Sequence, residues 1–133
     1  MCPQGATGEN TMTFKLLKLA AGAAMLFAGT AHAESFGAIS ISPETGATGW
    51  SFNAQSRWRA EDISQGNCYD YAGDCRVAIW FRNACGAVAR GPDGWGADWG
   101  ESPRSAQRAA IAACSRHSDG CRVIRWQCSG AGY

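Results

Sequence analysis

Residues 75–94 read CRVAIWFRNACGAVARGPDG, and this stretch decides the fold because it joins the end of one unit to the start of another. Its opening, Cys75-Arg76-Val77-Ala78-Ile79-Trp80, is echoed by Cys121-Arg122-Val123-Ile124-Arg125-Trp126. Its second part, residues 86–94, echoes residues 37–46. The offset between matching positions drifts only from 49 to 46. We therefore predict an internal repeat of about 36–84 and 85–128.

Each repeat shows the same order of signals. A strand, a Pro- and Gly-containing turn and an aromatic strand come first, and a strand of branched and aromatic residues comes last. Between them lies a helix, capped by Ser56 in the first repeat and by Ser102, followed by Pro103, in the second. Its apolar face is weak in the first repeat (Ala60, Ile63, Ser64, Asn67, Cys68) and strong in the second (Ala106, Ala109, Ala110, Ala113, Cys114). We expect two ββαβ units, an α+β protein with a roughly six-stranded, mainly antiparallel sheet and two helices.

The N-terminal region predicts export. Lys15 and Lys18 precede an apolar run, and residues 31–33 (Ala-His-Ala) form a small-residue cleavage site. This order is typical of a signal peptide, and the run of about 13 residues is shorter than the ~20 that span a bilayer. We expect translation to start at Met12 and cleavage to follow Ala33. Residues 1–33 are then extension and signal, residues 34–133 form one domain, and the protein is periplasmic or extracellular.

The charge balance of residues 34–133 argues against two classes of partner. Ten arginines stand against ten acidic residues, and no lysine remains, so the net charge is near zero. Nucleic acids and anionic membranes both select a positive excess. We expect neither nucleic-acid binding nor stable membrane insertion after cleavage.

The cysteines predict disulfides. Six follow the cleavage site, an even number typical of a disulfide framework in a small exported domain, and none lies closer than seven positions to another, which argues against zinc. Fifteen connectivities are possible. The matched spacing favours Cys68–Cys75 and Cys114–Cys121, which leaves Cys85–Cys128 to link the two units.

A family resemblance rests on three motifs. They are Gly-Ala-x-Ser-x-Ser-x-x-Thr-Gly at residues 37–46, Cys-Arg-Val-x-x-Trp-Phe-Arg-Asn-Ala-Cys-Gly-Ala at 75–87, and a second Cys-Arg-Val after an Ala-rich helix. Over residues 36–128 the chain resembles a bacterial secreted family known as a domain of unknown function, DUF4189. It departs from the usual Ala-rich first helix at Trp58 and Arg59. The resemblance implies fold and export, and it implies no catalytic residues.

The sequence contains no evident catalytic set, so the catalytic residues are unknown. His117 is the single histidine after Ala33, and its Ser/His/Asp surroundings are one local run, whereas catalytic triads assemble from distant segments. Asp70 and Asp74 are expected to form a turn. A carboxylate pair drawn from Asp93, Asp98 and Glu101 is conceivable. We expect no metal and no cofactor.

Tryptophan and arginine mark a candidate binding surface. Trp80 and Trp126 occupy matching strand positions and are expected in the core. Trp95 and Trp99 lie four positions apart, which predicts that both point to one face of a strand. They lie among glycines, where exposed indoles could stack on sugars or anchor a protein, and the alternative that they pack on the opposite hairpin remains open. Together with Arg82 and Arg90, which suit carboxylate contacts, they form the candidate surface.

These observations favour a non-enzymatic exported module that binds a protein or a cell-envelope component such as peptidoglycan or another glycan. Two alternatives remain open. One is a cell-envelope glycan hydrolase, and the other is a small secreted inhibitor.

Overall fold

The computed structural model describes residues 33–130, so the expected start and most of the signal segment lie outside the described residues. The α+β class, the two helices and the ββαβ order of both halves are confirmed. The elements are β1 (Phe36–Ile41), β2 (Thr48–Ala54), α2 (Arg57–Tyr69), β3 (Arg76–Arg82), β4 (Cys85–Gly91), β5 (Gly94–Gly100), α3 (Pro103–Ser115) and β6 (Arg122–Cys128).

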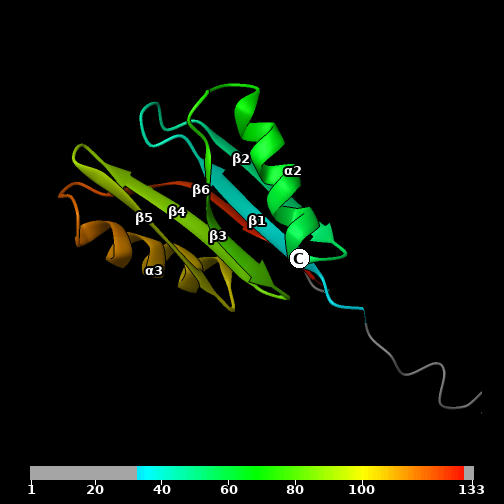
Figure 1. Cartoon of the computed structure of the whole chain (residues 1–133). Helices are drawn as coiled ribbons and strands as arrows, with labels where there is room; N and C mark the ends of the chain where they lie inside the picture. Colours follow the sequence, from blue (N-terminus) through cyan, green and yellow to red (C-terminus); the bar gives the residue numbers. More distant parts are fainter. Residues whose placement is uncertain (1–32, 131–133) are drawn as a thin grey trace, which may run out of the picture. The chain divides into compact units, whose positions relative to one another are not determined.

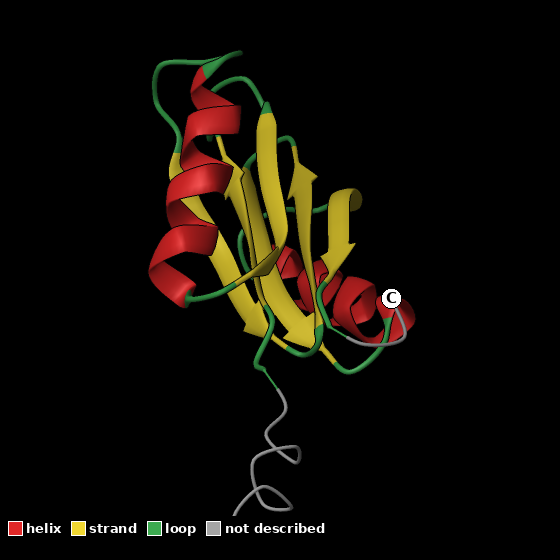
Figure 2. Ribbon diagram, turned by 90° about the vertical axis from the view of Figure 1, so that its right-hand side faces the viewer, coloured by secondary structure: helices red, strands yellow, loops and turns green. Residues whose placement is uncertain are grey.

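The six strands form two sheets and not the single sheet expected from the sequence. One sheet has the order β2-β1-β3 and the other β5-β4-β6, and every pairing is antiparallel. The break falls between β3 and β4, where Asn83 has a left-handed φ of 48°. The sheets pack face to face, α2 covers the outer face of the first, and α3 covers that of the second (Figures 1 and 2).

The alternation of side chains along β1 and β4 supplies both faces of each sheet. Ala38 in β1 packs toward α2, whereas its neighbour Ile39 points between the sheets. In β4, Ala87 packs toward α3 and Val88 between the sheets. Because both faces are covered, both sets of positions are apolar.

Phe81 is buried between the two sheets. A Cβ atom added to Gly37 would lie 2.3 Å from its ring, and one added to Gly86 would lie 2.4 Å from it. Any side chain at either glycine would therefore displace the ring, and these two matching glycines let the sheets meet.

Both predicted helix caps are confirmed. The side chains of Ser56 and Ser102 accept hydrogen bonds from backbone N–H groups of the first turn, and Ser105 completes a capping box in α3. The apolar face of α3 is buried as expected at four of its five positions. In α2, Ile63 is exposed, because α2 contacts the sheet along a narrower stripe of Ala60, Ser64 and Cys68.

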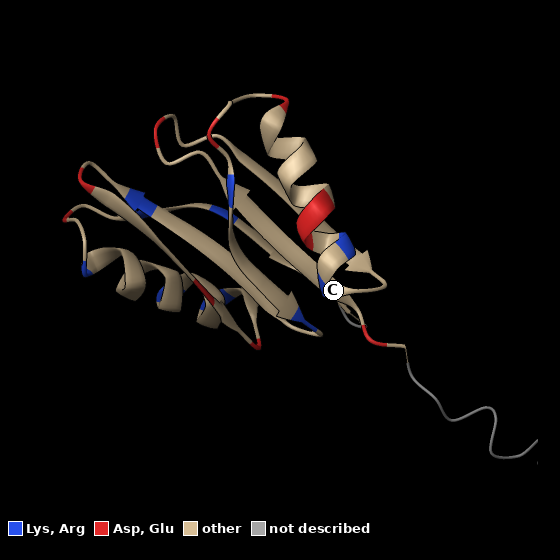
Figure 3. Ribbon diagram, viewed as in Figure 1, with Lys and Arg blue, Asp and Glu red and all other residues tan. Residues whose placement is uncertain are grey.

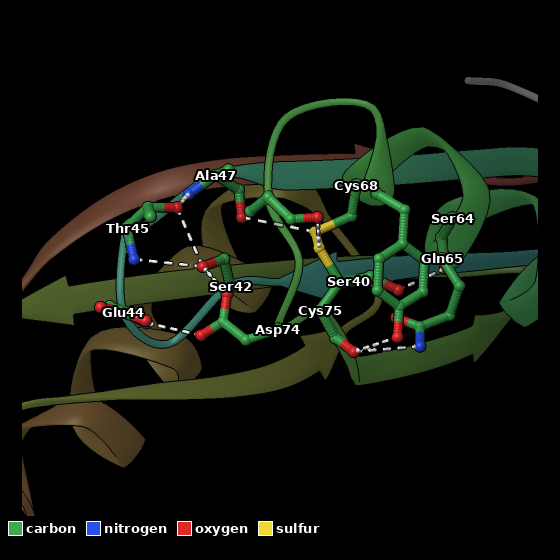
Figure 4. The surroundings of a disulfide bond; sticks show 12 residues. Ser40, Ser42, Glu44, Thr45, Ala47, Ser64, Gln65, Cys68, Asp74 and Cys75 are labelled. Carbon is green, nitrogen blue, oxygen red and sulfur yellow. Dashed lines mark hydrogen bonds between the residues drawn. A yellow bond between two sulfur atoms is a disulfide. The ribbon is translucent and has the colours of Figure 1, made fainter.

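All three disulfides join the expected cysteines. Cys68–Cys75 and Cys114–Cys121 each tie a helix end to the segment that begins the following strand. Figure 4 shows the first of them, where Gln65 donates a hydrogen bond to the carbonyl of Cys75. Cys85 and Cys128 are direct register partners in β4 and β6. This cross-strand disulfide lies within one sheet, so the expectation that it links the two units is wrong.

Candidate functional site

The four residues of the candidate surface lie in two pairs. Trp95 and Trp99 share the face of β5 that points away from α3, as their spacing predicts, but four positions along a strand separate them by about 13 Å. Trp95 lies with Arg90 in one hollow, and Trp99 lies with Arg82 in another. The structure therefore offers two distinct sites.

The larger hollow, which we call the hairpin cleft, has a volume of about 660 Å³. It lies between the β4–β5 turn and the C-terminal end of α3. Its charged and aromatic lining residues come from the β4–β5 hairpin and from the turn after α3, and they are Arg90, Asp93, Trp95, Arg116 and His117. Figure 3 shows arginine and aspartate gathered around this end of the β4–β5 hairpin.

Arg90 builds one wall of the hairpin cleft. Its Nη2 donates to the carbonyl oxygens of Pro43, at 3.3 Å, and Glu44, at 2.9 Å. These bonds tie the β1–β2 turn of the first sheet to β4 of the second. Arg90 therefore positions the wall, and its remaining donors are the part available to a ligand.

Ser118 positions the opposite wall, and the sequence analysis did not single it out. Ser118 is buried. Its Oγ accepts a hydrogen bond from the backbone amide of Asp93 at 3.0 Å and donates one to the carbonyl oxygen of Asp119 at 2.8 Å. The loop after α3 is thereby fixed to the hairpin tip, beside Arg116 and His117. A serine in a loop carries no sequence signal for such a role.

The smaller hollow, which we call the edge hollow, has a volume of about 290 Å³. Four consecutive residues of β3, 79–82, form one side, and Trp99 forms the other. Trp99 is 55% exposed. Arg82 makes an exposed ion pair with Glu34 at 3.3 Å, and such a pair contributes little to stability.

The prediction of a core position fails for Trp126. Trp80 packs against the cluster under α2, where the guanidinium of Arg57 lies 4.5 Å from its ring. Trp126 is 45% exposed. Counted from the two helix caps, Pro103 stands in α3 where Arg57 stands in α2, and proline lacks a side chain long enough to cover the indole.

The structure separates two of the candidate carboxylates. Asp93 lies in the β4–β5 turn, and Asp98 lies five positions further along, about 17 Å away in extended chain. Glycosidase pairs lie about 5 to 10 Å apart. Asp98 pairs in register with Ala87, which faces α3, and its Oδ1 accepts the amide of Trp99. Glu101 follows β5 in an exposed bend.

Asp74 holds a turn, as expected, but the turn belongs to the β1–β2 connection. Its carboxylate accepts a hydrogen bond from the hydroxyl of Ser42 and another from the amide of Glu44 at 3.2 Å (Figure 4). The bond from Ser42 is the main reason why the pKa of Asp74 lies below its usual value. Asp70 caps the C-terminal end of α2.

Residues 33–130 contain no group of three histidine, cysteine, aspartate or glutamate side chains placed to hold a metal ion. Neither helix in this range is long and apolar enough to cross a membrane.

The fold and its bridges define a small disulfide-bonded α+β domain. The model of a family described as a domain of unknown function, DUF4189, matches residues 36–128, and the chain belongs to this family. Comparison with curated proteins gave no match. Comparison with solved structures gave none either.

Proposed function

We propose that this protein is an exported, non-enzymatic binding module of the periplasm or the cell exterior, built from a duplicated ββαβ unit. Two observations support export. Residues 1–33 have the order of a signal peptide, and the three disulfides suit an oxidising compartment.

The hairpin cleft is the proposed binding site, and its ligand is an acidic glycan of the cell envelope, such as peptidoglycan. The observation that carries this proposal is that Arg116, His117 and the partly buried Trp95, which also packs against the cluster between the sheets, line the same open hollow. An indole can stack on a sugar ring, and an arginine can hold a carboxylate through two parallel hydrogen bonds.

The charges of the hairpin cleft favour an anion. Two arginines line it against the single carboxylate of Asp93. Arg116 is exposed, and within residues 33–130 it makes no ion pair. Its guanidinium can therefore bind a ligand without first breaking an ion pair within the protein.

Co-sedimentation of the oxidised domain with purified peptidoglycan sacculi tests the proposal. We expect the wild-type domain to pellet, Arg116→Glu to stay in solution, and Arg104→Glu to pellet as the wild type does. The two arginines are both exposed on or next to α3, and both changes alter the net charge equally, so the comparison isolates the cleft. Trp95→Ala should also lose binding, in a preparation whose unfolding transition shows that it is folded.

Two results would contradict the proposal. Equal loss in both arginine variants would mean that binding depends on overall charge and not on the cleft. Absence of the wild-type domain from the pellet would exclude peptidoglycan as the ligand. Release of soluble sugar fragments during the incubation, abolished by Asp98→Asn, would favour the hydrolase alternative.

A further inference from the structure

One edge of the first sheet is open. β3 pairs with β1 on one side, and no strand within residues 33–130 pairs with its other side. Its central residues, 77–81, include no charged residue and no proline. Charged residues and prolines usually protect a strand edge from pairing with another chain. The outer backbone groups of β3 are therefore a template for a further strand.

The regular part of this edge coincides with the edge hollow. The register between β1 and β3 shifts beside Ala78, and beyond that bulge Ile79 to Arg82 pair one to one with β1. These same four residues line the edge hollow. Trp99, projecting from the second sheet, supplies an exposed indole on its far side.

Arginines mark both ends of the same strand. Arg76 begins β3 and Arg82 ends it, and both are exposed, whereas the five residues between them are apolar. The complementary ligand strand is apolar in its centre and acidic at both ends. The corresponding strand of the second sheet, β6, differs because Arg125 lies in its middle, and an inward-pointing charge is one device that protects an edge.

We propose that the outer edge of β3 binds an extended peptide segment of a protein partner as a fourth strand of the first sheet. The segment has an apolar centre that contacts Trp99 and an acidic residue near each of Arg76 and Arg82. Backbone hydrogen bonds supply affinity in this mode of recognition, and alternate side chains supply specificity. This site is separate from the hairpin cleft, and its test does not depend on a glycan ligand.

The test uses the oxidised domain and a blocked peptide of seven residues, the length of β3. The peptide has glutamate at both ends and alternating valine and threonine between them. We expect saturable binding by isothermal titration, and slower hydrogen exchange at amides of β3 on the outer edge, measured by NMR. A peptide with proline at its centre should bind at least tenfold more weakly, because it cannot complete the ladder.

Variants of exposed side chains locate the site. Trp99→Ala should weaken binding about tenfold, whereas Trp58→Ala, which removes an indole that is 70% exposed on α2, should leave it unchanged. Arg82→Glu should weaken binding of the glutamate peptide several-fold and improve binding of a peptide that has lysine at the end facing position 82 and keeps glutamate at the end facing Arg76.

Four outcomes would overturn the proposal. They are absence of saturable binding, protection of β6 amides in place of β3 amides, equal affinity in the Trp99→Ala variant, and protection of β3 amides that rises with protein concentration alone. The last would show that a second copy of the chain occupies the edge.

Discussion

Replacing Ser64 with alanine should destabilise the domain more than replacing Ser40, although both changes remove the same hydrogen bond. The two hydroxyls are fully buried between α2 and β1, and their oxygen atoms lie 2.8 Å apart. Ser64 Oγ also donates to the carbonyl of Glu61 at 2.9 Å. Ser40 has no second partner within residues 33–130. Only Ser64→Ala therefore leaves a buried hydroxyl without a hydrogen bond.

The magnitudes follow from this asymmetry. A buried polar group left without a partner costs about 1 to 3 kcal/mol, so we expect Ser64→Ala to lower the free energy of unfolding by about 2 kcal/mol. Ser40→Ala loses one bond and leaves Ser64 satisfied, at a cost of about 0.5 to 1 kcal/mol. The double variant should be close to the wild type, because both hydroxyls are gone. The second half already has alanine at the corresponding positions, Ala89 and Ala110, packed in one cluster.

Guanidinium unfolding of the four proteins, followed by circular dichroism with the disulfides intact, measures these differences. With a slope of about 2 kcal/mol per molar denaturant, the midpoint of Ser64→Ala should fall by about 1 M. The reasoning would be refuted if Ser40→Ala cost as much as Ser64→Ala, or if the double variant lost the sum of the two single effects. Either result would show that the hydroxyls do not act as a coupled pair.

Three further predictions concern stability. Gly96→Ala would place a Cβ atom 2.2 Å from the backbone nitrogen of Cys114, so we expect it to cost more than about 3 kcal/mol in guanidinium unfolding. Gly66→Ala, in an open helix position, is its matched control and should gain about 1 kcal/mol. Each disulfide restricts the unfolded chain, and the restriction grows with the number of residues that the bridge encloses. Replacing the cross-strand disulfide, whose cysteines lie 43 positions apart, with two serines should therefore cost about 4 kcal/mol. Replacing either of the bridges that enclose seven positions should cost about 2 kcal/mol. An unfolding midpoint unchanged by the serine pair would contradict that account. The hydrogen bond from Ser42 lowers the pKa of Asp74 in the folded state. The stabilisation from this bond is therefore present above the unfolded-state pKa of about 3.9, and it is lost as the pH falls through the folded-state pKa. Asp74→Asn should therefore reduce the acid sensitivity of the midpoint, and an identical pH profile would exclude this role.

The features that depend on local sequence rules were predictable. Ser56 and Ser102 cap helices because a hydroxyl before a helix satisfies a free backbone N–H group. The matched seven-position spacing of the cysteines led to the correct pairs. The number of sheets was not predictable in this way. Apolar residues on both faces of β1 are equally consistent with one sheet covered by helices on both faces and with two sheets packed against each other. The short Asn83-Ala84 connection gives no sign that β3 and β4 part.

The candidate site was predictable residue by residue but not as an arrangement. The spacing of Trp95 and Trp99 correctly placed both on one face of a strand. The two tryptophans lie in different hollows because the loop after α3 lies beside the Trp95 end of β5, whereas β3 lies beside the Trp99 end. The exposure of Trp126 depends on a residue of another element, since Pro103 cannot cover it as Arg57 covers Trp80. Such effects appear only when distant segments are brought together.

Because no disulfide within residues 33–130 crosses from one sheet to the other, the two halves are joined covalently through a single short segment, Asn83-Ala84. A cut there would yield two fragments, each with its own helix and sheet, the first with one internal disulfide and the second with two. Separation of the fragments would expose the apolar face of Ile39, Phe81 and Val88 to water, so they should reassociate at sufficient concentration. The domain is thus a natural candidate for a split reporter in oxidising compartments, where fragments fused to two other proteins would regain the complete fold when those proteins meet.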